Sequence, residues 1–181
     1  MTSPRFASNR IKFVLAWALA FIIRLLPFRP ANFEPILAML MPVSKRFGAT
    51  ASFAFGFLSI ALFDLVTSGI GEWTYITAIA YGGLGVFSSL YFRNRAASRR
   101  NFLAFGIVGT LVYDAVTGLI PGPLFHHQSF MVALTGQIPF TLSHLAGTIA
   151  FTLVLSPVLS RWLAKEDVLE LTPALAAVEA R

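Results

Sequence analysis

The sequence predicts an all-α integral membrane protein, a bundle of six transmembrane helices with both termini in the cytoplasm. Three observations support this prediction. Hydrophobic residues make up 56% of the 181 residues and charged residues only 12%, and the mean hydropathy is +0.73, unlike a typical soluble domain. Several apolar runs approach the ~20 residues that a helix needs to cross a bilayer. The Lys and Arg residues gather in short stretches between these runs, as they do in cytoplasmic loops.

The composition also excludes several classes of function. The chain has no cysteine, which rules out disulfides, thiolate metal sites and cysteine nucleophiles. It has no Gly-x-Ser-x-Gly or His-Glu-x-x-His motif and no Gly-x-x-x-x-Gly-Lys loop for ATP. We therefore expect neither an enzyme nor a resident cofactor, and any uphill transport would draw on a partner or an ion gradient. The net charge of +6 lies mostly between apolar runs, which argues against nucleic acid as a partner.

One domain is expected, with residues 1–10 as a cytoplasmic N-terminal segment, 11–163 as the membrane domain and 164–181 as a polar cytoplasmic tail. The first span is predicted over Ile11–Leu26 and is retained, because no small-residue cleavage site follows it. Ala16 and Ala20 are spaced for one helix face, where small residues let a second helix approach closely. Ordinary alanine content explains the pair equally well.

The next segment cannot continue that helix. Pro27–Pro35 contains three prolines, Pro27, Pro30 and Pro35, and it is predicted to be an ordered outer loop.

 The apolar run Ile36–Val43 that follows is too short to cross a bilayer alone. It can cross only if residues 32–34 lie in the outer interface or in a cavity lined by protein.

Two full spans are predicted next. Phe47–Ser68 runs outward from Lys45 and Arg46, and Gly69–Glu72 forms a tight outer turn. Trp73 then opens a span that ends near Phe92, and a tryptophan at that level fits an aromatic belt. Thr74, Thr77 and Tyr81 share one face of this span by their spacing.

The remaining chain predicts two further spans. Arg93–Arg100 is the strongest cytoplasmic loop signal. Asn101–Leu119 runs outward, and Ile120–Gln128 forms an outer loop. Gly136 and Pro139 are expected to divide the last apolar stretch into a short outer segment over 129–136 and a sixth span over 138–162.

An internal repeat places two aspartates at equivalent positions. Ala54-Phe55-Gly56 and Asp64 recur as Ala104-Phe105-Gly106 and Asp114, at the same offset and without a gap. Because the copies lie two crossings apart, both aspartates are predicted at the same depth near the outer side. Aspartate is costly in a bilayer and is rarely left there without a role or a partner.

The charge distribution agrees with this topology. Of the 14 Lys and Arg residues, only Arg24 and Arg29 fall on the outer side. Four of the eight acidic residues also fall there, and the rest lie in the tail. This asymmetry satisfies the positive-inside rule.

Polar residues in or near the spans collect on the outer side, which predicts a pocket open to the outside. The candidate substrate-binding residues are Asn32, Glu34, Asp64, Trp73, Thr77, Tyr81, Asp114, His126, Gln137 and His144. Simpler interpretations remain for each. Either aspartate can cap its own helix or pair with Arg24 or Arg29, His126 and His127 can be surface residues, and His144 can bond a backbone carbonyl. A metal site from the three histidines with Asp114 is a further alternative, although the spacing matches no known ligand pattern.

These motifs, in this order, resemble the substrate-binding S component of energy-coupling factor (ECF) transporters. The resemblance covers roughly residues 10–163. It rests on Ala16-x-x-x-Ala20, Arg24–Pro27 with Pro30–Pro35, Asp64–Gly69 with Trp73-Thr74, and Pro139–His144. It implies a multi-pass binder of a vitamin or related micronutrient in the bacterial cytoplasmic membrane, working with a transmembrane coupling subunit and two ATPases. It also implies that Ala16 and Ala20 face the coupling subunit.

The resemblance bears on the substrate as well. The chain begins Met-Thr-Ser and lacks the N-terminal histidine of nickel and cobalt members, which argues against a metal ion. A neutral or cationic organic molecule is expected, and a corrinoid is one candidate. Two other classes stay open: a scaffold protein without a ligand, and a membrane enzyme that uses Asp114 with His126 or His144.

Overall fold

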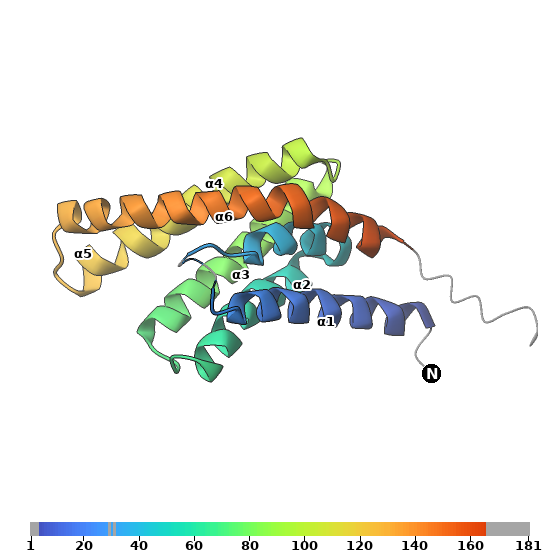
Figure 1. The fold of residues 1–181 in the computed structure, drawn as a ribbon, viewed down its shortest axis with the longest axis horizontal. Coiled ribbons are helices and arrows are strands. Elements are labelled where there is room, and N and C mark those ends of the chain that lie inside the picture. The colour runs from blue at the N-terminus through green and yellow to red at the C-terminus, as the bar shows by residue number, and fades with distance from the viewer. Residues whose placement is uncertain (1–3, 29, 31, 166–181) are drawn as a thin grey trace, which may run out of the picture.

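The structure, a computed structural model, describes residues 4–28, 30 and 32–165, and residues 166–181 of the tail predicted over 164–181 lie outside the described residues. The described residues form six helices. They are α1 (Pro4–Leu25), α2 (Ile36–Val66), α3 (Glu72–Arg93), α4 (Arg99–Leu119), α5 (Pro121–Phe125) and α6 (Phe130–Ala164). The expected all-α class is therefore confirmed for this part of the chain (Figure 1).

Among the residues that the structure describes, four segments are long and apolar enough to cross a membrane: Ile36–Val66, Glu72–Arg93, Arg99–Phe125 and Phe130–Ala164. The first helix does not join them by that measure, and it carries Lys12 and Arg24 within its apolar run. Many large apolar side chains on the outside of the bundle are exposed, including Leu19, Ile79 and Val154. Such a surface suits lipid rather than water, so the protein is membrane-embedded.

Helix α2 contains a break that reverses the chain. Gly48 has φ 80° and ψ −174°, a backbone conformation that glycine adopts without steric cost. Before the break, Lys45 donates from Nζ to the carbonyl of Phe92 near the end of α3. After it, the chain runs back along α3 until Asp64 meets Thr74 in the first turn. The expected boundary between the runs 36–43 and 47–68 thus corresponds to a sharp turn inside one assigned helix.

The last apolar stretch differs from the prediction. Gly136 and Pro139 do not divide it, because α6 is assigned as one helix over Phe130–Ala164 with Pro139 and Pro157 inside. A proline removes one backbone donor from a helix, and inside a membrane bundle neighbouring groups can compensate for that loss. The expected outer loop 120–128 likewise contains a one-turn helix, α5.

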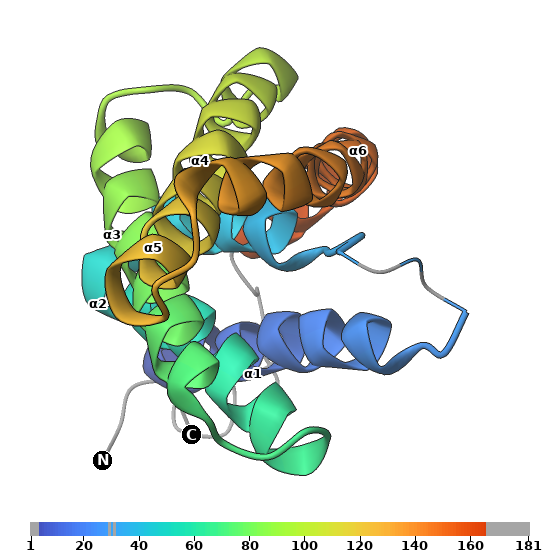
Figure 2. The ribbon, with the colours of Figure 1, turned by 90° about the vertical axis from the view of Figure 1, so that its left-hand side faces the viewer.

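The elements place unlike charges at opposite ends of the bundle. At one end, Arg46 bonds Asn9 and the carbonyl of Leu163, which joins the start of α1, the α2 break and the end of α6. We call this the basic end, and the ends of α3 and α4 that carry Arg93 and Arg99 meet there through Phe92 and Phe102. The opposite end, called the polar end, holds the end of α1, the first turn of α3 and the start of α6. Figure 2 views the bundle from the polar end.

Glycines set the close packing of α2 on α3. A Cβ atom added to Gly56 would collide with the backbone carbonyl of Tyr81, and one added to Gly85 would collide with that of Ser52. Without these glycines the two helices could not approach so closely. The repeat partner of Gly56 has a related role, because a Cβ on Gly106 would lie 3.1 Å from the Thr148 methyl of α6.

This packing predicts that Gly85→Ala destabilises the bundle by about 1–3 kcal/mol, the usual cost of overpacking a tight contact. Thermal unfolding of the purified protein in detergent measures the effect. Gly83→Ala is the matched control on the same helix, since nothing lies within 4 Å of its added Cβ. Equal melting temperatures for the two variants would contradict the assigned contact.

Candidate binding site

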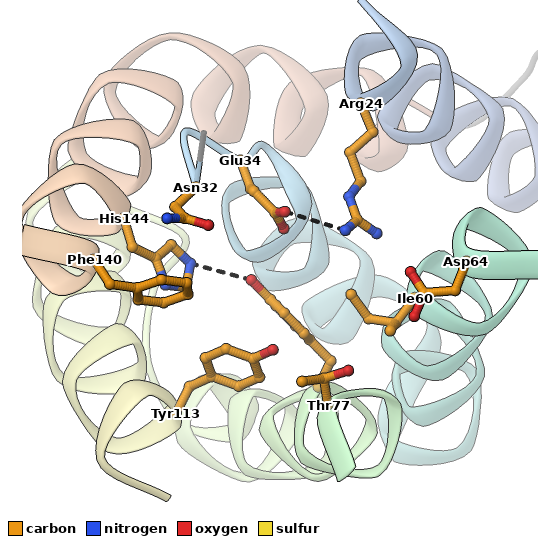
Figure 3. A pocket seen from close by; sticks show the side chains of 10 residues that line it. Arg24, Asn32, Glu34, Ile60, Asp64, Thr77, Tyr113, Phe140 and His144 are labelled. Atoms are coloured by element: carbon orange, nitrogen blue, oxygen red, sulfur yellow. Dashed lines mark hydrogen bonds and ion pairs between the residues drawn. The ribbon is translucent and has the colours of Figure 1, made fainter. Parts of the chain in front are cut away.

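A cavity of about 100 Å³ lies at the polar end and is called the inner cavity (Figure 3). Residues from α1, α2, α3, α4, α6 and the segment before α2 surround it, and most of them are polar or aromatic. They are Arg24, Asn32, Glu34, Ile60, Asp64, Thr77, Tyr81, Tyr113, Phe140 and His144. Six of the predicted site residues therefore share one cavity, although they come from four separate parts of the sequence.

A buried ion pair crosses the wall of the inner cavity. The Arg24 Nη2 atom lies 3.1 Å from Glu34 Oε1, and the two side chains are 9% and 15% exposed. Arg24 also donates to the carbonyl of Ser59 at 2.9 Å and lies over the Phe63 ring at 3.9 Å. The sequence left open an Arg24 pair with one of the aspartates, whereas the partner here is Glu34. The pair ties α1 to the segment that precedes α2.

A chain of hydrogen bonds joins three helices beside the inner cavity. Asp114 Oδ1 of α4 lies 2.7 Å from His144 Nδ1 of α6, and His144 Nε2 lies 3.2 Å from the Tyr81 hydroxyl of α3. All three residues are at least 97% buried. His144 thus bonds two side chains, and the alternative of a bond to a backbone carbonyl is not what the structure shows. The second oxygen of Asp114 has no partner among the described residues.

Asp64 occupies a different environment from its repeat partner. Its Oδ2 accepts a bond of 2.7 Å from the Thr74 hydroxyl, which in turn accepts from the backbone N–H of Gly71 at 3.1 Å. Asp64 is only partly buried and lies two residues before the end of α2. Asp114 lies five residues before the end of α4 and connects through His144 to Tyr81, which lies two helical turns beyond Thr74 on α3. The expectation that both aspartates lie at the same depth is therefore wrong, because each aspartate lies at a different distance from the end of its own helix.

A second cavity, of about 310 Å³, adjoins the first and is called the outer cavity. Thr77, Tyr113 and Phe140 line both cavities and so form the wall between them. The remaining lining comes from α3, α4, α6 and the segment before α6. Those residues are Trp73, Thr117, Gly118, Gln128, Val132, Ala133, Gly136 and Gln137.

The other predicted site residues divide between the cavities and their surroundings. Trp73 and Gln137 line the outer cavity. His126 lines neither cavity among those found, but it stacks on Trp73 at 6.2 Å between ring centroids and lies 3.5 Å from Glu72. Asp114 does not line the inner cavity, but it is hydrogen-bonded to His144, which does. Whether any of these residues contacts a ligand stays a prediction.

Sequence reasoning missed four residues that line the inner cavity: Arg24, Ile60, Tyr113 and Phe140. Arg24 was considered only as a charge partner. Tyr113 and Phe140 stand beside Asp114 and within the run Pro139–His144, so their positions next to the polar residues were the available signal. Ile60 had none, because an isoleucine in a span usually faces lipid or the core.

The two alanines of α1 are not where the resemblance implies. Ala16 and Ala20 are 1% and 0% exposed and belong to the core cluster. They therefore offer no surface to a coupling subunit in this structure. Their small side chains instead allow α1 to pack closely within the bundle.

The three histidines and Asp114, the residues of the alternative metal site, do not all come together either. Within residues 4–28, 30 and 32–165 there is no group of three His, Cys, Asp or Glu side chains that could hold an ion. His144 and Asp114 pair with each other, while His126 lies at Glu72.

The unequal settings of the two aspartates predict unequal costs of removal. Asp114→Ala leaves the buried His144 Nδ1 without its partner, and we expect a loss of about 1–3 kcal/mol in unfolding free energy. Asp64→Ala removes a partly exposed bond, and we expect a smaller loss of about 1 kcal/mol or less. Thermal unfolding in detergent compares the two. Equal losses would show that the buried chain does not carry this energy.

Comparison with known proteins identifies a family but no function. No curated protein matches the chain, and no solved structure matches it. One family model, described as a family of unknown function (DUF6580), matches residues 5–168 and so covers every helix of the bundle. The chain therefore belongs to the DUF6580 family.

Proposed function

We propose that the protein is the substrate-binding membrane subunit of an ECF-type importer for a vitamin or related micronutrient. The observation that carries the proposal is the pair of adjoining cavities at the polar end of an otherwise apolar bundle. Small-molecule sites are typically mostly apolar hollows with a few placed polar groups. The two cavities have this character, with aromatic rings and a small set of hydrogen-bonding side chains.

The sequence motifs that resemble S components supply much of the cavity lining. Arg24 opens the Arg24–Pro27 motif, Asn32 and Glu34 belong to the proline-rich segment, and Phe140 and His144 belong to the last run. These segments lie far apart in the sequence and meet at one site. Their convergence supports a shared role in binding a ligand.

The proposed topology has six crossings with both termini in the cytoplasm. It counts the two arms of α2 on either side of Gly48 as separate passes and includes α1. The positive-inside rule then assigns the basic end to the cytoplasm, and the cavities at the polar end open away from it. In a bacterium this is the cytoplasmic membrane with the site facing outward, as uptake requires.

The absence of cysteine makes this topology directly testable. We expect Leu124→Cys, at an exposed position of α5, to react with a membrane-impermeant maleimide in intact cells. Arg95→Cys, at the basic end, should react only after the membrane is permeabilised. Mass-shift gels measure both. Labelling of Arg95→Cys in intact cells would reverse the proposed orientation.

The cavities also limit the substrate. Together they match a small vitamin, since pockets for such ligands usually measure roughly 300–1,000 Å³. A corrinoid is much larger than either cavity, so the structure favours a smaller molecule. The coupling subunit and the two ATPases remain proposed partners, and with Ala16 and Ala20 buried they would dock on other faces.

A scaffold protein without a ligand is the second candidate. The small volume of the inner cavity and the bonded state of many of its polar groups favour it. In that case the polar groups only hold the helices together.

Binding to a panel of vitamins and their precursors separates the two candidates. We expect one compound to bind the purified protein with sub-micromolar affinity by isothermal titration calorimetry, and a coupling subunit and ATPases to copurify from the native membrane. Asp64→Asn should weaken that binding, whereas Tyr75→Phe, at an exposed position of α3, should not. A panel without any such ligand would reject the transport proposal and favour the scaffold.

A further inference from the structure

We infer that the inner cavity receives a cationic, hydrogen-bond-donating group, such as an ammonium or amidinium, while the apolar body of the ligand lies in the outer cavity. This inference rests on the proposed binding function and specifies the chemical class of the ligand. It follows from the charge balance of the inner cavity and from the direction of its hydrogen bonds.

The charge balance of the inner cavity is negative. Its lining contains one cationic side chain, Arg24, and two carboxylates, Glu34 and Asp64. Arg24 and Glu34 neutralise each other at 3.1 Å. Asp64 has no ion pair among the described residues, and its bond comes from the neutral Thr74 hydroxyl. An uncompensated carboxylate in a partly desolvated cavity favours a cation and disfavours an anion.

The buried chain beside the cavity also favours a donor. An ionised Asp114 can only accept, so His144 places its proton on Nδ1 and leaves Nε2 as an acceptor. The Tyr81 hydroxyl must then donate to Nε2. Its oxygen keeps only acceptor capacity for the inner cavity, which it lines. A ligand group that donates a hydrogen bond can bind to the Tyr81 oxygen. A ligand group that can only accept has no donor at this atom.

The outer cavity suits a flat apolar group. Trp73, Tyr113 and Phe140 supply three aromatic rings, and Gln128, Gln137 and Thr117 supply hydrogen bonds at its sides. Tyr113 and Phe140 also belong to the wall shared with the inner cavity. A ring placed between them and Trp73 would direct its charged substituent towards Asp64 and Tyr81.

Three matched probes test the inference: benzamidine, benzamide and benzoate, which share one ring and differ in the charge of the substituent. Isothermal titration calorimetry of the full-length protein in detergent gives their dissociation constants. We expect benzamidine to bind at least about tenfold more tightly than benzamide, the effect of one charge-assisted hydrogen bond. Benzoate should bind most weakly. Benzoate binding as tightly as benzamidine would overturn the inference.

Two variants make the assignment specific. Asp64→Asn should remove most of the preference for benzamidine over benzamide, while Glu72→Gln should preserve it, because Glu72 lies at the same end but lines neither cavity. A preference for benzamidine that survives Asp64→Asn would contradict the assigned group.

These outcomes are distinguishable from failure of the proposed transport function. A vitamin panel without a ligand, combined with a clear benzamidine preference, would reject uptake and retain the cation site. A tightly bound vitamin whose inner group is anionic would retain uptake and reject the cation site.

Discussion

The structure depends on the need to satisfy buried polar groups inside a bundle that has apolar surroundings. In hydrocarbon, water cannot replace a missing hydrogen-bond partner. The chain from Asp114 through His144 to Tyr81 meets this need by joining α4, α6 and α3. Smaller pairs act in the same way: Ser44 bonds Ser88, and Thr110 bonds Thr148. Each such bond restricts how neighbouring helices can shift along each other.

The same constraint explains why the site lies where it does. The first turn of α3 and the end of α2 are tied by Asp64 and Thr74, and the segment before α2 is tied to α1 by Glu34 and Arg24. These bonds fix the rim of the inner cavity from several directions. Its floor is the Tyr81–His144 contact. The cavity is held by groups that also stabilise the fold, so in the proposed function binding and stability share residues.

The internal repeat illustrates how one sequence pattern serves two purposes. Gly56 and Gly106 both permit close helix contact, with α3 in one copy and with α6 in the other. The aspartates that follow them diverge, because Asp64 stands near a helix end and Asp114 lies among other helices. Sequence spacing predicted that each copy would run toward the same end. It could not predict depth, since depth depends on where each helix stops.

The sequence by itself determined the helical class, most element positions, and the gathering of polar residues at one end, because hydrophobic periodicity and loop charge are local properties. It also placed Asn32, Glu34, Thr77, Tyr81 and His144 near a common site. Only the tertiary structure decided that α2 turns back at Gly48, that α6 continues through Pro139, and that Ala16 and Ala20 are buried. The partners of Arg24 and His144 were likewise undetermined, because each has several chemically suitable partners in the chain. Packing selects among them by which helices come within hydrogen-bond distance.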